Sequence, residues 1–235
     1  MEVQIAVSKI RKYATSDSGD TVEVVERPKG GLSVVMADGQ SSGRGAKWIS
    51  TLVVRKVISL LAEGVRDGAA ARAASDYLFT ERRGKVLATL NILSVDLQTK
   101  TLVVTRNNPA AVLLARAAEV DCLEEPSLPI GIYRDTRPLI TELPLCIGLT
   151  AVAYTDGLVH AGSRTGKTLD IQESLKASLA GDSISSQEIA DSLLAKAVEL
   201  DQGRPVDDIS VAVLRVSSRA GDEVRRLHVR LPIGP

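Results

Sequence analysis

The stretch SVVMADGQSSGRGA, residues 33–46, joins an apolar β-rich segment to a helical segment through a glycine-rich turn. Two interpretations are open: the glycines could let the backbone cradle a phosphate, or Asp38 could hold a ligand at the end of a strand. Residues 39–48 do not match the nucleotide-binding pattern G-x-x-x-x-G-K-[ST], because position 44 is Arg and no Ser or Thr follows Lys47. The sequence therefore favours a role for Asp38.

The segments around this stretch alternate between β-rich runs and short turns. Residues 22–27 and 32–37 flank a Pro-Lys-Gly-Gly turn, and residues 86–97 and 101–106 flank Gln-Thr-Lys. Each pair is therefore predicted to form an antiparallel hairpin. Further strands are predicted at 111–115, 136–143, 150–155 and 209–216.

Helices are predicted where apolar side chains repeat at helical spacing. Residues 44–63 carry one broad apolar face, and residues 69–79 favour a second helix by propensity. Ser185 and Glu188 have the spacing of a capping box at the start of a third helix. Because hairpins predominate and helices come in adjacent pairs, an α+β fold of antiparallel sheets covered by helices suits the chain better than a doubly wound parallel sheet.

Composition and charge exclude several classes of protein. The 235 residues include 29 Lys or Arg and 29 Asp or Glu, so no net charge attracts nucleic acid or an anionic membrane. No signal-peptide pattern is present, and two cysteines are too few for a disulfide framework. We therefore expect a cytoplasmic protein.

The chain is expected to form one domain over residues 1–235. Its C-terminal extension, 219–235, could add an edge strand at 222–231.

Four aspartates share one local context, at or beside the end of a β-rich run and next to a turn. A single Asp-Gly pair is more often a plain turn than a ligand, so the prediction depends on the ordered set. Carboxylates on rigid strand ends can converge, and the hard oxygen donors favour Mg²⁺ or Mn²⁺ over Zn²⁺. The four residues are Asp20, Asp38, Asp156 and Asp207.

A series of motifs in this order resembles the metal-dependent type 2C (PPM) protein phosphatases, and most of all their SpoIIE-like branch. The resemblance implies an α-β-β-α sandwich of two antiparallel sheets flanked by helices, with a binuclear metal site at one end. It also implies hydrolysis of phosphoserine or phosphothreonine in proteins. The motifs are SGD (18–20), ADGQSSGRGA (37–46), LATLNILSVD (87–96), NNPAAVLLAR (107–116), SLPIGI (127–132), YTDGLVHA (154–161) and DDISVAVLR (207–215).

The resemblance also implies a role for each acidic position. Asp38 would bridge two Mn²⁺ or Mg²⁺ ions, and the carbonyl of Gly39 would complete one coordination shell. Asp156 and Asp207 would hold one ion, and Asp20 would serve the other directly or through water. A water activated by the ions would attack phosphorus in line, without a covalent enzyme intermediate. Asp208 is expected to orient the loop or a water in the second shell rather than to bind metal.

The chain departs from the family pattern at two turns. Ser41 replaces the second glycine of DGxGxG; it could add a hydroxyl near the metals and is a candidate for substrate binding. Leu149 stands where an acid is usual. Arg44 is either a phosphate contact or a solvated side chain. Trp48 is expected in the core. His160 could be a general acid, although a surface position is favoured.

The expected partners follow from the branch of the family that the chain resembles. It is similar to stand-alone stressosome phosphatases, whose substrates are phosphorylated STAS-domain scaffold proteins. One alternative is a phosphatase of an anti-anti-sigma factor. The other is a pseudophosphatase that binds phosphorylated STAS partners without hydrolysing them, although all four acidic positions are retained.

Overall fold

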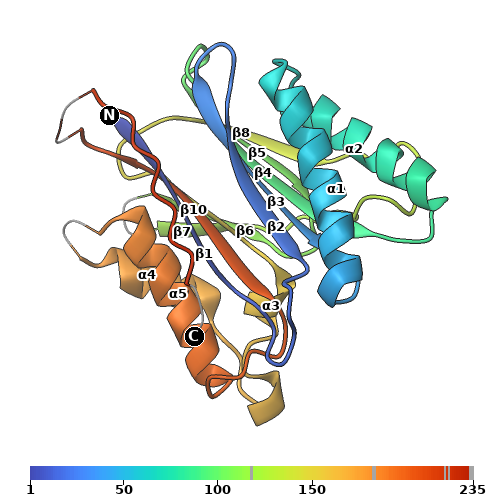
Figure 1. The fold of residues 1–235 in the computed structure, drawn as a ribbon. Helices are drawn as coiled ribbons and strands as arrows, with labels where there is room; N and C mark the ends of the chain where they lie inside the picture. The colour runs from blue at the N-terminus through green and yellow to red at the C-terminus, as the bar shows by residue number, and fades with distance from the viewer. Residues whose placement is uncertain (117–118, 182–183, 220, 222, 233–235) are drawn as a thin grey trace.

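Two five-stranded antiparallel sheets form the centre of the computed structural model, which describes residues 1–116, 119–181, 184–219, 221 and 223–232 (Figure 1). In spatial order, the first sheet consists of β1 (Glu2–Ile10), β10 (Ile209–Ser217), β9 (Thr150–Tyr154), β6 (Val112–Arg116) and β7 (Glu119–Leu123). The second sheet consists of β2 (Asp20–Glu26), β3 (Gly31–Gly39), β4 (Ala88–Asp96), β5 (Thr101–Asn107) and β8 (Leu139–Pro144).

Helices cover the outer face of each sheet (Figure 1). The second sheet is covered by α1 (Gly43–Ala62) and α2 (Asp67–Arg82), and the first by α4 (Ile171–Leu179) and α5 (Ser186–Leu200). Two short helices, α3 (Asp156–Val159) and η1 (Ser163–Thr165), follow β9. These layers confirm the expected α+β fold, an α-β-β-α sandwich. None of the described helices is long and apolar enough to cross a membrane.

Residues 33–39 lie in β3, a strand that is buried on both faces. Val34 and Met36 point into the core between the two sheets, whereas Val35 and Ala37 point toward α1 and α2. Successive side chains of a strand alternate between faces, so a central strand covered on both sides has no polar alternation. The uninterrupted apolar run in the sequence follows from this position.

Apart from the edge strand at 222–231, the predicted strands and helices are present, with ends that differ by a few residues, and the capping box of Ser185 and Glu188 is formed. The sequence pattern missed β1, β7, α3 and α4.

The prediction of an edge strand at 222–231 is wrong for the part of that segment that the structure describes. Residues 223–231 contain no strand, and β1 lies beside β10 at that edge of the first sheet. The alternate apolar side chains of the segment, Leu227, Val229 and Leu231, are exposed. Pairing is therefore not stabilised by burial of an apolar face. Residue 222 and the other undescribed positions of 219–235 lie outside this observation.

Candidate metal centre

The four predicted aspartates lie at one end of the sandwich because neighbouring strands end there. In the second sheet, β2 and β3 are paired so that Asp20 is opposite Asp38. In the first sheet, β9 and β10 are neighbours; Asp156 follows β9 at the start of α3, and Asp207 precedes β10. The two sheets thus supply two aspartates each.

A pocket of about 260 Å³ lies between these strand ends. Three of the predicted carboxylates line it, together with Gly39, whose carbonyl was expected to be a ligand. Asp20 does not line this pocket. The lining residues are Asp38, Gly39, Gln40, Ser41, Leu87, Thr89, Asp156, Asp207 and Asp208.

Asp20 is fully buried, and residues of the other sheet hold its carboxylate. Its Oδ2 accepts hydrogen bonds from Thr155 Oγ1 at 3.0 Å and from Ser210 Oγ at 2.6 Å. Its Oδ1 has no hydrogen-bond partner among the described residues. Burial raises the pKa of Asp20 to about 6, against the lowering effect of the Ser210 hydrogen bond. The arrangement leaves one buried carboxylate oxygen for a further ligand.

Two lysines contact the backbone carbonyl of Asp20. Lys9 Nζ donates to the Asp20 carbonyl at 2.5 Å, and Lys47 Nζ donates to the same oxygen at 2.8 Å. Burial and the nearby Lys47 lower the pKa of Lys9. Both cations contact the backbone carbonyl rather than the carboxylate, and the charge of Lys9 lowers the pKa of Asp20, against the effect of burial.

Asp38 is the most perturbed carboxylate of the centre. Burial, followed by the charges of Asp20 and Asp156, raises its pKa to about 9. The pKa of Asp156 is also raised, first by burial and then by Asp207. Without a bound cation, the folded chain therefore retains a proton here, which is the behaviour of carboxylates crowded at a cation site.

Two glycines allow the loops of the centre to approach closely. A Cβ on Gly39 would lie 2.1 Å from the carbonyl oxygen of Ala46, and one on Gly157 would lie 2.1 Å from that of Asp208. Such contacts are too short for any side chain. These positions therefore keep the start of α1 against Asp38, and the start of β10 against Asp156.

Asp208 fastens a loop to the start of β10. Its Oδ1 accepts from the backbone N–H of Lys12 at 2.9 Å, and its Oδ2 accepts from that of Gly19 at 2.8 Å. Both carboxylate oxygens are thus bonded to the segment that leads into Asp20.

The residues present fit hard divalent cations. The donors are carboxylates and one backbone carbonyl, Asp20 Oδ1 is buried without a partner among the described residues, and burial followed by the neighbouring carboxylates raises the pKa of Asp38. Within the described parts of the chain, no three Asp, Glu, His or Cys side chains already converge on one point. Mg²⁺ commonly keeps several waters and uses one or two carboxylates, so carbonyl and water ligands would complete the shells.

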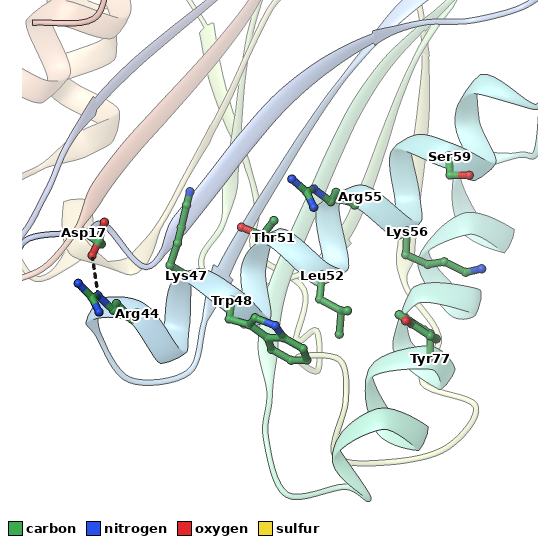
Figure 2. A pocket seen from close by; sticks show the side chains of 10 residues that line it. All are labelled: Asp17, Arg44, Lys47, Trp48, Thr51, Leu52, Arg55, Lys56, Ser59 and Tyr77. Carbon is green, nitrogen blue, oxygen red and sulfur yellow. Dashed lines mark ion pairs between the residues drawn. The ribbon is translucent and has the colours of Figure 1, made fainter.

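Ser41 and Arg44 occupy different places. Ser41 lines the acidic pocket and has a φ of +80°, the left-handed conformation that favours glycine. Arg44 lies outside that pocket: its side chain is 92% exposed, and its Nε lies 3.7 Å from Asp17 Oδ2 (Figure 2). In this structure Arg44 is therefore a solvated side chain at the surface.

Two other expectations have clear outcomes. Trp48 is 45% exposed, so its predicted place in the core is wrong; the guanidinium of Arg82 lies 4.0 Å from its ring centroid. His160 is exposed at the end of α3, as favoured. Leu149, which stands where an acid is usual, is buried immediately before β9 and follows a turn in which Gly148 has a φ of +90°.

Sequence reasoning missed the polar side chains that hold Asp20. Thr155 and Ser210 lie within two of the quoted motifs, one residue before Asp156 and two after Asp208. Because they lie next to predicted metal-site aspartates, the sequence could have indicated them as further site residues. Lys9 and Lys47 gave no such signal, since each lies on a different element from the carbonyl that it contacts.

Solved structures share this fold at low sequence identity. The PP2C phosphatase domain of SpoIIE from Bacillus subtilis, with a fragment of its regulatory domain, gives a TM-score of 0.78 at 21% identity, covering 92% of this chain and 64% of that one. This chain therefore spans less than two thirds of that structure. RsbX in complex with magnesium gives 0.70 at 18% identity, covering 92% and 96%. The catalytic domain of the phosphatase PstP with two manganese ions gives 0.67 at 18%, covering 92% and 99%.

The sequence also matches a family model. Among curated proteins, none matches the chain. The model described as Stage II sporulation protein E (SpoIIE) matches residues 28–217, which include three of the four predicted aspartates. The chain therefore belongs to the SpoIIE family and has the fold of the PP2C serine/threonine phosphatases.

Proposed function

We propose that this chain hydrolyses phosphoserine or phosphothreonine in cytoplasmic regulatory proteins, with two Mn²⁺ or Mg²⁺ ions bound at the acidic pocket. The observation that carries the proposal is the meeting of Asp38, Asp156 and Asp207 with Gly39 in one pocket of a SpoIIE-family chain. The magnesium bound by RsbX and the two manganese ions bound by PstP support the choice of ions.

Each residue of the centre has a distinct task in this proposal. Asp38 would be shared by the two ions, with the Gly39 carbonyl beside it. Asp156 and Asp207 would hold one ion, and Asp20, oriented by Thr155 and Ser210, would serve the other. When bound, such ions supply an activated water for in-line displacement and offset the charge of the phosphoryl oxygens. Asp208 keeps the loop before Asp20 in place through two backbone N–H groups.

The proposed substrate is a phosphorylated STAS-domain protein, either a stressosome scaffold protein or an anti-anti-sigma factor. The first of these is favoured by the resemblance to RsbX, which extends over 96% of the RsbX chain. No step of the proposed chemistry depends on which of the two is correct.

The proposal is tested by phosphate release from a phosphorylated STAS-domain protein with and without Mn²⁺. We expect Mn²⁺-dependent release, and a loss of about 1000-fold in Asp38→Asn, because several kcal/mol of charge stabilisation depend on the ions. The matched control is Asp121→Asn, an exposed aspartate of β7, which should retain full activity. Circular dichroism checks that both variants fold.

Two results would contradict the proposal. Binding of the phosphorylated protein without Mn²⁺-dependent release would make the chain a binding protein rather than an enzyme. Full activity of Asp38→Asn would show that the ions are not shared by that carboxylate.

A further inference from the structure

A groove of about 760 Å³ runs along the exposed side of α1, with Tyr77 of α2 lining its wall (Figure 2). The groove begins next to the acidic pocket. Lys47, which lines it, also donates to the backbone carbonyl of Asp20, and the adjacent Ala46 packs against Gly39. Lys47, at the near end of the groove, thus directly follows a residue that contacts the acidic pocket.

The groove is basic although the chain as a whole is neutral. Helix α1 carries four cationic side chains and no Asp or Glu between residues 43 and 62. All four line the groove: Arg44, Lys47, Arg55 and Lys56. Asp17 is the carboxylate among the lining residues, and it lies beside Arg44 at the near end. The rest of the groove is thus a stripe of positive charge.

Of the four cationic side chains, Arg55 is the one most available to pair with an anionic partner. It is exposed, and it forms no ion pair with any residue that the structure describes. Lys47 donates to a carbonyl and a hydroxyl rather than to a carboxylate. An anionic partner could therefore pair with these groups without breaking an existing ion pair.

Two aromatic rings line the groove, and each has a cation at one face. The guanidinium of Arg82 lies 4.0 Å from the Trp48 centroid, and Lys56 Nζ lies 5.5 Å from the Tyr77 centroid. Proteins that bind single-stranded nucleic acid leave aromatic faces free for stacking on bases. Here the rings hold cations in place, which favours an acidic peptide over a nucleic acid.

We propose that this groove binds an acidic segment of the substrate protein, adjacent in sequence to the phosphorylated residue; this inference rests on the proposed phosphatase function. From Arg44 to Lys56 the helix extends about 18 Å, at 1.5 Å per residue. An extended segment of about five or six residues spans that length. A few Asp or Glu side chains would therefore lie against the stripe while the phosphorylated residue occupies the acidic pocket.

The experiment compares three synthetic phosphoserine peptides and para-nitrophenyl phosphate in Mn²⁺ at 50 mM NaCl. One peptide has four Glu after the phosphoserine, one has four Glu before it, and one has Gln at all of these positions. We expect one acidic peptide to exceed the Gln peptide about tenfold in kcat/KM, through KM. In 500 mM NaCl the advantage should largely disappear, because salt screens exposed charges.

A charge reversal locates the effect on the groove. Arg55→Glu should raise KM for the preferred acidic peptide about fivefold, because it replaces attraction by repulsion. It should leave para-nitrophenyl phosphate and the Gln peptide unchanged. The matched control is Arg72→Glu, an exposed arginine of α2 outside the groove, which should leave KM for the acidic peptide unchanged.

Several outcomes would overturn the groove proposal. Equal rates for all three peptides would do so while leaving the phosphatase proposal intact. An equal effect of Arg55→Glu and Arg72→Glu would mean that overall charge, not the groove, is responsible. Tighter binding of a labelled single-stranded oligonucleotide than of the acidic peptide, lost in Arg55→Glu, would assign the groove to nucleic acid. A dimer in light scattering that Arg55→Glu dissociates would assign it to a second copy of the chain.

A binding measurement separates this proposal from the phosphatase proposal. If no compound releases phosphate, the phosphatase proposal fails. Fluorescence anisotropy of the labelled acidic peptide without phosphate then tests the groove by itself. Weaker binding to Arg55→Glu than to Arg72→Glu would support the groove as an acidic-peptide site, and equal binding would overturn it.

Discussion

At the scale of single residues, Ser41 is the clearest departure from what the backbone favours. Its φ of +80° is readily adopted by glycine but costs another residue about 1 kcal/mol. We therefore expect Ser41→Gly to raise the free energy of unfolding by about 1 kcal/mol, measured by urea denaturation. The control is Ser42→Gly, since Ser42 has a φ of −145° and gains nothing from glycine. An equal gain in both variants would show that strain at Ser41 is not the cause.

At the scale of elements, a buried ion pair fixes the start of α2 against the second sheet. Asp67 Oδ1 accepts from Arg27 Nη1 at 2.7 Å and from Ser94 Oγ at 2.9 Å, and both charged side chains are largely buried. Arg27→Met would leave the carboxylate buried without its cation, so we expect a loss of about 3 kcal/mol of unfolding free energy. The exposed pair of Arg225 and Glu26, at 3.4 Å, provides the control: Arg225→Met should change stability by less than about 0.5 kcal/mol. Similar losses in chemical denaturation would contradict this difference.

The elements also show how far the sequence could predict the structure. Central strands such as β3 are apolar on both faces and end at glycine turns, so their pattern is strong, and it places Asp38 at a strand end. By contrast, β1 lies at a sheet edge and has few buried side chains, so its pattern is weak. Trp48 was misplaced because its surroundings depend on Arg82 of another helix. The hydroxyls that hold Asp20 come from residues 135 and 190 positions away, a distance that no local pattern reveals.

At the scale of the whole molecule, the two sheets bring carboxylates together at one end, and their burial and mutual repulsion link stability to pH. The folded chain keeps a proton on Asp38 up to a pH of about 9, whereas an unfolded aspartate releases it near pH 4. Because the folded state binds more protons across that interval, the stability of the metal-free protein should fall as the pH rises from about 4 to 9. Mn²⁺ competes with protons for the same carboxylates, so it should raise the melting temperature more at pH 8 than at pH 6. Calorimetry of the metal-free and Mn²⁺-loaded protein measures both effects, with Asp38→Asn as the control. That variant should have a less steep metal-free profile, and the raised pKa values of Asp20 and Asp156 account for the slope that is left. A metal-free profile equally steep in Asp38→Asn would mean that the pH dependence arises elsewhere in the fold.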